Sequence, residues 1–318
     1  MTDACALPSP FAVLGLDVLE RGWLSANQLV FGRFGATTPA VVDTGFHAHA
    51  EQTVALVEQA LAGQRLERIV NTHLHSDHCG GNAALQATGD VRTWVPQPSL
   101  RAVQRWDEAS LTYRPTGQAC PRFAAECALV PGETIELGPA SWQIHAAPGH
   151  DMDAVLFFEP ESRTLVSGDA LWESRLAIIF PEFVGQDGFG ATRATLALIE
   201  RLAPNWVVPG HGRPFEDVGE ALASSRQRVA AYEREPARHA GHAARALLMF
   251  RLLEVRRAAT ATLADWMATT PVFRPIARGA GVIDEDLRPW ACDHLRRLVD
   301  DGILQAHGDD VFVPAQAR

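Results

Sequence analysis

Residues 71–81 hold a dense group of metal-binding residue types, and no other segment limits the possible folds as strongly. The segment reads Asn-Thr-His-Leu-His-Ser-Asp-His-Cys-Gly-Gly. Its candidate ligands are His73, His75, Asp77 and His78. Imidazole and carboxylate groups together suit zinc, iron, manganese or nickel better than calcium or magnesium. The sequence therefore predicts a transition-metal site built around one short segment.

The flanking residues place this motif at the end of a strand. The apolar residues within 66–70 predict a buried strand, and the two glycines after the motif predict a turn into a helix. Side chains alternate along an extended chain, so His73 and His75 would point to the same side and could share one ion. Asp77 and His78, where the chain turns into the helix, could hold a second ion.

Composition excludes several other classes of protein. The chain has 318 residues, 47% of them hydrophobic, which fits a globular protein with one large and one smaller domain. It contains no lysine, which excludes Schiff-base catalysis and a P-loop. A net charge of -10 disfavours nucleic acid and anionic membranes as partners. Neither a secretory leader nor a membrane span is apparent, so we expect a cytoplasmic protein.

Three further ligand-type residues lie in glycine-containing turns, each directly after an apolar run. They are His150, Asp169 and His211. Glycine allows tight turns, so ligands from separate strands can converge. The five cysteines are an odd number without Cys-x-x-Cys spacing, so they predict neither a disulfide framework nor a cysteine zinc site.

With these motifs in this order, residues 11–235 closely resemble the metallo-β-lactamase fold superfamily, and in particular its glyoxalase II-like hydrolase branch. The resemblance implies an α/β fold, a four-layer αβ/βα sandwich, with two divalent metal ions, zinc foremost and iron or manganese as alternatives. The implied ligands are His73, His75 and His150 for the first ion, Asp77, His78 and His211 for the second, and Asp169 as the bridge. Asp43, in an Asp-Thr-Gly turn, would support the site from behind.

The resemblance also implies a reaction. A hydroxide held between two metal ions would attack a carbonyl carbon or a phosphorus atom, with Asp77 orienting it and passing on its proton. True β-lactamases generally lack the bridging Asp169. We therefore expect hydrolysis of an ester, thioester or lactone in a small-molecule substrate. The alternatives are a phosphodiesterase or single-strand ribonuclease, a mononuclear iron dioxygenase, and a metal-sensing module that binds DNA or protein.

Domain organisation follows from a break in the pattern near Glu235-Pro236. We expect an N-terminal tail over residues 1–10, a catalytic domain over 11–235, and a winged-helix-like domain over 236–318. The expected C-terminal elements are helices at 243–255, 262–267 and 286–299 and a hairpin at 302–314. Such a domain could shape the pocket, mediate a homodimer or bind a partner.

Two loops and three side chains complete the expectations. The irregular segment 94–130, with a short helix near 98–106, is predicted to be a lid or pocket wall. The apolar loop 171–183 would wall a substrate pocket or form a dimer contact. Cys79 is predicted to be a small buried residue. His239 and His242 are predicted to cap a helix or face solvent.

Overall fold

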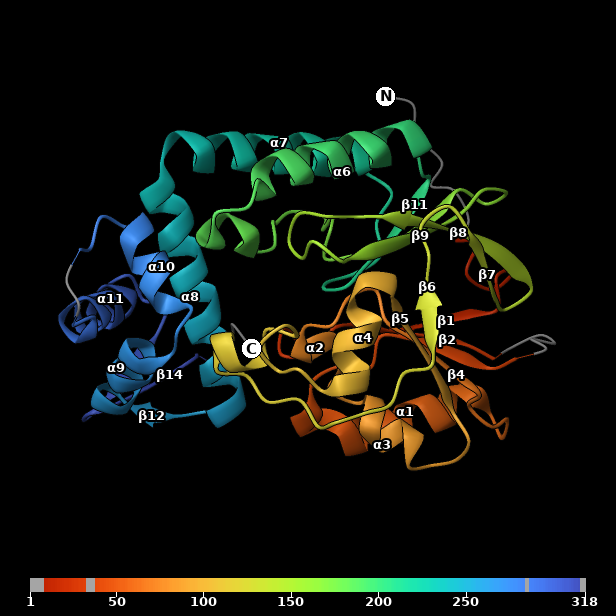
Figure 1. Ribbon diagram of the computed structural model, residues 1–318, viewed down its shortest axis with the longest axis horizontal. Helices are drawn as coiled ribbons and strands as arrows, with labels where there is room; N and C mark the ends of the chain where they lie inside the picture. Colours follow the sequence, from red (N-terminus) through yellow and green to blue (C-terminus); the bar gives the residue numbers. More distant parts are fainter. Residues whose placement is uncertain (1–8, 33–37, 284–285, 315–318) are drawn as a thin grey trace, which may run out of the picture.

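The structure is a computed structural model that describes residues 9–32, 38–283 and 286–314. Nearly all of the tail predicted for residues 1–10 lies outside these ranges. Two mixed sheets form the centre of the larger part of the molecule (Figure 1). Among the described residues, no helix is both long and apolar enough to cross a membrane.

The first sheet has the strand order β1-β2-β3-β4-β5-β6. Its strands are β1 (Leu16–Leu19), β2 (Gln28–Phe31), β3 (Ala40–Val42), β4 (Arg68–Val70), β5 (Arg92–Pro96) and β6 (Cys127–Leu129). The pairs from β1 to β3 are antiparallel, and the pairs from β3 to β6 are parallel. The ends of β3 and β4 therefore lie side by side at one edge of the sheet.

The second sheet has the order β11-β10-β9-β8-β7. Its strands are β7 (Thr134–Leu137), β8 (Ala140–Ala146), β9 (Val155–Glu159), β10 (Thr164–Gly168) and β11 (Trp206–Pro209). Only β10 and β11 pair in parallel. This parallel pair brings the turns after β10 and β11 together.

Alternating burial explains why the sheets stack. Val42 and Val70 point into a core shared by both sheets, where Trp142 and Phe157 of the second sheet meet them. The neighbouring residues on the same strands point to the opposite face and pack on helices, as Ile69 does. A strand buried on both faces appears in the sequence as a continuous run of apolar residues. Residues 66–70 and 206–209 are partly such runs.

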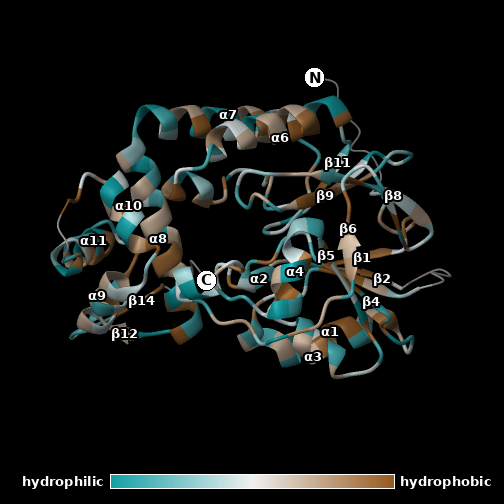
Figure 2. Ribbon diagram, viewed as in Figure 1, coloured by the Kyte–Doolittle hydropathy of each residue, from teal (hydrophilic) through white to brown (hydrophobic). Residues whose placement is uncertain are grey.

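Helices cover the outer face of each sheet. The first sheet is covered by α1 (Ala50–Leu61) and α3 (Asn82–Gln86), and the second by α6 (Gly188–Leu202) and α7 (Val218–Arg234). Figure 2 shows hydrophobic and hydrophilic residues mixed along α1, α6 and α7, as expected for helices with one buried face. The four layers of the predicted αβ/βα sandwich are confirmed.

The C-terminal part is mainly helical, as predicted. It contains α8 (Pro236–Val255), α9 (Thr260–Thr269), α10 (Phe273–Gly279) and α11 (Arg288–Asp300), with a small sheet of β12 (Ala258–Ala259), β13 (Gln305–His307) and β14 (Asp310–Phe312). The expected hairpin is β13–β14. Helix α10 and strand β12 were not predicted, and α8 begins at Pro236 instead of near 243, since proline is well suited to the first turn of a helix. The winged-helix assignment and the domain boundary stay predictions.

Segment 94–130 is less irregular than expected. It completes β5, continues as α4 (Gln97–Arg105), contains the short α5 (Tyr113–Thr116) and ends in β6. The helix predicted near 98–106 therefore exists, and the segment returns to the first sheet as an edge strand.

Candidate metal centre

All seven predicted site residues meet between the two sheets, at the strand ends where the chain turns. His73 and His75 follow β4, and Asp77 and His78 lie on the short helix α2 (Ser76–Cys79). The others come from the second sheet: His150 after β8, Asp169 after β10 and His211 after β11. Three overlapping groups within this set have ligand atoms close enough to share an ion.

His73 and His75 lie beyond the end of the strand, although the backbone at His75 is extended as predicted (φ -66°, ψ 149°). Strand β4 ends at Val70, and the next residues are irregular because Thr72 donates its N–H to the Asp43 side chain and not to a neighbouring strand (2.9 Å). The two imidazoles nevertheless face each other, with Nε2 of His73 lying 3.1 Å from Nδ1 of His75.

The first ligand group is His73, His75 and His150. Nε2 of His150 lies 2.7 Å from Nδ1 of His75, so three ring nitrogens point at one small space. Their remaining nitrogens face other partners. Nδ1 of His150 contacts the carbonyl oxygen of Ile178, and Nδ1 of His73 lies 3.1 Å from Oγ1 of Thr72. Such outer contacts orient imidazoles toward a metal.

The second ligand group is Asp77, His78 and His211. Nε2 of His211 lies 3.1 Å from Oδ2 of Asp77. Nε2 of His78 is buried and makes no hydrogen bond, although Oδ2 of Asp77 is only 3.9 Å away. A buried ring nitrogen that faces two carboxylates without a well-formed hydrogen bond to either is the arrangement that a bound cation would satisfy.

Asp169 lies between the two groups. Its Oδ1 is 3.3 Å from Nε2 of His78, and its Oδ2 is 3.5 Å from Nε2 of His150. Each carboxylate oxygen is therefore turned toward a different group. The indole N–H of Trp172 also donates to Oδ1 of Asp169 (3.2 Å).

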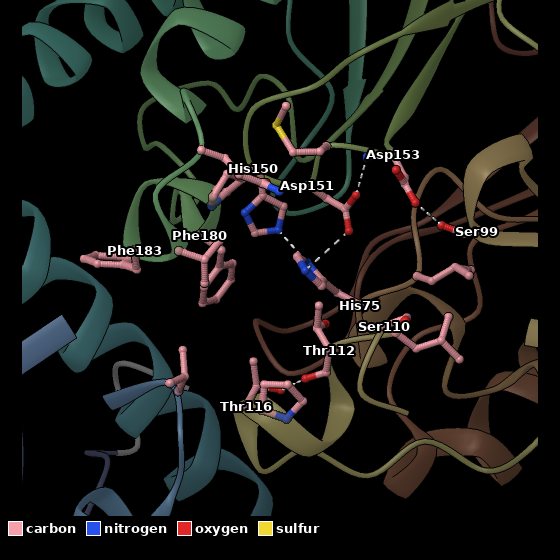
Figure 3. A pocket seen from close by; sticks show the side chains of 18 of the residues that line it. His75, Ser99, Ser110, Thr112, Thr116, His150, Asp151, Asp153, Phe180 and Phe183 are labelled. Atoms are coloured by element: carbon pink, nitrogen blue, oxygen red, sulfur yellow. Dashed lines mark hydrogen bonds and ion pairs between the residues drawn. The ribbon is translucent and has the colours of Figure 1, made fainter. Parts of the chain in front are cut away.

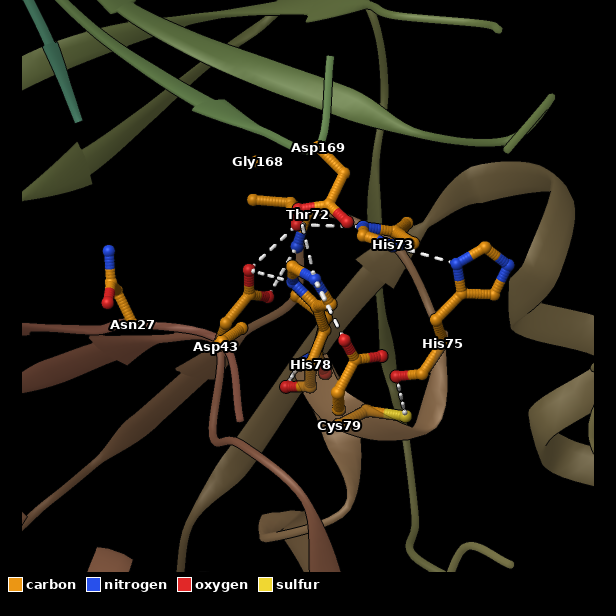
Figure 4. A network of polar contacts seen from close by, with 12 residues as sticks. Asn27, Asp43, Thr72, His73, His75, His78, Cys79, Gly168 and Asp169 are labelled. Atoms are coloured by element: carbon orange, nitrogen blue, oxygen red, sulfur yellow. Dashed lines mark hydrogen bonds and ion pairs between the residues drawn. The ribbon is translucent and has the colours of Figure 1, made fainter. Parts of the chain in front are cut away.

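Asp43 supports the site without being one of the proposed ligands, as predicted. Its Oδ2 accepts hydrogen bonds from Nδ1 of His78 and from Oγ1 of Thr72, both at 2.8 Å (Figure 4). The bond to His78 leaves Nε2 as the ring nitrogen that faces the candidate metal centre. Asp43 adopts a left-handed backbone (φ 56°), which aspartate tolerates better than most residues.

Burial and charge set the protonation of the cluster. Burial lowers the pKa of His73 well below its usual value and lowers that of His75 and of His150 to about 4. Burial alone would raise the pKa of Asp169, but the neighbouring His78 and His211 hold it well below the usual range. Burial would also lower the pKa of His78, but the carboxylates of Asp169, Asp43 and Asp77 raise it well above its usual value, so a cation at its Nε2 would displace a proton. Neutral imidazoles and ionised carboxylates are the forms that bind metals. The residues therefore fit two divalent cations in chemistry and in arrangement.

Two glycines make the close approach of these elements possible. Gly168 has φ 50°, and a side chain there would meet Thr72. At Gly210 a Cβ atom would collide with Oδ1 of Asp169 and would lie 2.8 Å from Cε1 of His78. Both glycines thus belong to turns in which any larger residue would push ligands apart.

The family profile described as the metallo-beta-lactamase superfamily matches residues 21–211. The chain belongs to the metallo-β-lactamase superfamily. Within the superfamily, it is 26% identical over 180 residues to the hydroxyacylglutathione hydrolase of Rhodospirillum rubrum, with 54% of this chain and 58% of that protein covered. The chain thus spans little more than half the length of this relative.

Other superfamily members match over longer stretches. The human acyl-coenzyme A thioesterase MBLAC2 is 27% identical over 230 residues, with 62% of this chain and 78% of that protein covered. The crystal structure of a metallo-β-lactamase family protein from Thermus thermophilus has a TM-score of 0.56 at 20% identity, covering 94% of this chain and 99% of that chain. This last similarity shows that the fold is shared.

Some functional side chains were missed from sequence, and one prediction was wrong. Thr72 and Asp151 were not considered, although Oδ2 of Asp151 lies 3.7 Å from Nε2 of His75. The position of Asp151 directly after His150 was the available signal. His239 does not face solvent: it is buried and stacks on Phe183 because α8 begins earlier than expected.

Cys79 is buried, as predicted. Its thiol lies 3.1 Å from the hydroxyl of Tyr113, and burial raises its pKa well above the usual value. A buried thiol held in the neutral form is a poor nucleophile. The chemistry of this site therefore depends on its imidazoles and carboxylates.

Proposed function

We propose that this chain is a dinuclear metal-dependent hydrolase that cleaves an ester, thioester or lactone. The observation that carries the proposal is the placement of Asp169, which turns Oδ1 toward His78 and Oδ2 toward His150. A carboxylate with one oxygen toward each of two ligand groups suits a bridge between two ions.

The ligand roles follow from the two groups. His73, His75 and His150 would hold one ion, Asp77, His78 and His211 the other, and Asp169 would bind both. Zinc is the first expectation because it accepts imidazole and carboxylate ligands without a demanding geometry, and iron and manganese share this ligand preference.

Hydrolysis fits both the ligand set and the relatives. A bound pair of ions supplies a water of lowered pKa, which can act as a nucleophile near neutral pH. Asp77 turns Oδ2 toward His211, so its Oδ1 is the oxygen that could take a proton from the nucleophile and pass it to the leaving group. The names of the two relatives, a hydroxyacylglutathione hydrolase and an acyl-coenzyme A thioesterase, support an acyl bond as the target.

The test compares two bonds on one preparation. Purified protein with a measured metal content is assayed on an acyl thioester and on a phosphodiester, each with and without a chelator. We expect thioester cleavage that the chelator abolishes. Cleavage of the phosphodiester alone would contradict the proposal and favour a nuclease-like enzyme.

A further inference from the structure

A cavity of about 420 Å³ opens beside the first ligand group. His75 and His150 form part of its wall, so its contents would lie directly against that group (Figure 3). Phe180 stands over both histidines, with its ring 5.5 Å from that of His75 and 5.6 Å from that of His150. The volume lies in the range of small-molecule pockets, roughly 300–1,000 Å³.

A small majority of the side chains that line the cavity is apolar, and the others include four hydroxyl side chains and Gln186. Two of the apolar side chains, Met152 and Val184, are among the few large hydrophobic residues that the described structure leaves exposed, at 41% and 70%. Exposed apolar side chains gathered at a cavity indicate a surface that a ligand covers. The apolar loop 171–183 thus contributes Phe180 and Phe183 to a pocket wall, one of its two predicted roles.

The described side chains of the cavity wall include acidic groups but no arginine or lysine. The carboxylates are those of Asp151 and Asp153. Asp153 accepts a hydrogen bond from Oγ of Ser99 (2.7 Å), and Asp151 accepts one from the backbone N–H of Asp153 (2.7 Å). Apart from the ion proposed at His73, His75 and His150, the described lining residues offer no cation to a phosphate or carboxylate group placed in the cavity.

The walls of the cavity come from three parts of the chain, which contact one another: the segment around α5, the loop that ends in Phe183, and the C-terminal helices. The carbonyl oxygen of Pro115, in α5, accepts a hydrogen bond from the N–H of Val272, between α9 and α10 (2.9 Å). Phe183, at the end of the short helix η2 (Phe180–Val184), stacks on His239 of α8 at 4.4 Å. Val272 also lines the cavity. The C-terminal part of the chain therefore completes the wall of the pocket and is tied to the other two parts.

From these observations we infer that the cavity binds the acyl part of the substrate, and that this part is an uncharged, apolar chain. The inference rests on the proposed function. The acyl carbonyl would lie at His75 and His150, and the chain would run past Phe180 toward Val272. Anionic portions of a substrate would stay outside this cavity, on the leaving-group side of the scissile bond.

A series of thioesters with one leaving group and acetyl, butanoyl, hexanoyl or octanoyl groups tests the inference on the protein of residues 1–318. We expect kcat/KM to rise by about two- to fourfold for each methylene that the cavity buries. A series in which the terminal methyl is replaced by a carboxylate should be cleaved at least about tenfold more slowly. Equal rates along the first series, or a preference for the carboxylates, would overturn the inference.

Substitutions at Val272 locate the acyl chain. Val272→Phe should lower the ratio of octanoyl to acetyl kcat/KM by about tenfold because the larger side chain takes up space in the cavity. Val272→Arg should raise the rate on carboxylate-ended chains relative to their apolar counterparts. Val13→Phe is the control, since Val13 is 81% exposed and does not line the cavity. Ratios unchanged by both Val272 variants would place the acyl chain elsewhere.

Binding separates this inference from the proposed function. Methyl ketones with the same alkyl chains cannot be hydrolysed, and their affinity is measured by calorimetry on metal-loaded protein. Affinity that grows with chain length and falls in Val272→Phe supports the pocket even if no thioester is cleaved. Thioester cleavage combined with ketone binding independent of chain length would retain the hydrolase and overturn the pocket.

Discussion

Nδ1 of His78 lies 2.8 Å from Oδ2 of Asp43, and both side chains are almost completely buried. This contact determines which nitrogen of His78 faces the candidate metal centre. Asp43 also accepts hydrogen bonds from the hydroxyl and the backbone N–H of Thr72. One carboxylate therefore positions both the helix that carries Asp77 and His78 and the segment that leads to His73. The two candidate ion positions therefore share a support.

Replacing Asp43 should weaken metal binding although Asp43 is not a proposed ligand. Asp43→Asn keeps the size of the side chain and tolerates the left-handed backbone, but it removes the charge behind His78. We expect the affinity for at least one ion to fall by about ten- to a hundredfold. Competition titration with a chromophoric chelator measures this. The exposed Asp90→Asn is the control, and identical affinities in both variants would refute the role of Asp43.

Gly210→Ala should disrupt the centre by steric contact alone. The backbone of Gly210 is not left-handed, so alanine adds no conformational strain there, but its Cβ would collide with Asp169. We expect metal affinity to fall by about tenfold or more, with the free energy of unfolding of the metal-free protein changed much less. Gly219→Ala, where a Cβ meets nothing within 4 Å, is the matched control. Full metal binding in Gly210→Ala would show that the turn can relax.

Asp77→Asn tests the proposed proton transfer. An amide cannot accept the proton of the nucleophile, so kcat at saturating metal should fall by about 10²- to 10⁴-fold. Metal content is counted on the same sample, because Asp77 is also a proposed ligand. A variant that retains two ions and full activity would exclude Asp77 from catalysis. Asp301→Asn, on an exposed turn, controls for the change of charge.

Buried His239 should make the protein less stable in mild acid. Burial lowers its pKa to about 4 from the ordinary value of 6.5 expected in the unfolded chain. The unfolded state therefore binds the proton more readily than the folded state does. The free energy of unfolding should fall as the pH drops from about 6.5 toward 4, by at most about 1.4 kcal/mol per pH unit.

His239→Phe checks this effect. It keeps the stacking on Phe183 and removes the titrating group, whose Nε2 is buried without a hydrogen bond. Urea unfolding of the metal-free protein at several pH values should show a smaller acid loss in this variant than in the parent. The exposed His307→Phe should behave like the parent. Parallel stability curves for His239→Phe and the parent would contradict the prediction.

The sequence predicted the layers because apolar runs and glycine turns are local signals. Residues such as Val42, Val70 and Val208 are recognisable as core from their neighbours alone, and the resemblance supplied the sandwich. The end of β4 at Val70 was not predictable, since the N–H of Thr72 bonds to Asp43, which lies 29 residues earlier in the chain. His239 was misplaced for a similar reason: the start of α8 is set by Pro236, and its burial by Phe183 on a remote loop.

Metal stoichiometry measured together with activity tests the dinuclear hydrolase most directly. Metal-free protein is titrated with zinc, and bound zinc and thioester hydrolysis are measured on each sample. We predict two ions per chain, with activity that appears only as the second ion binds and is lost again with a chelator. Saturation at one ion with full activity, or hydrolysis that persists in the metal-free protein, would contradict the assignment of Asp169 as a bridge between two ions.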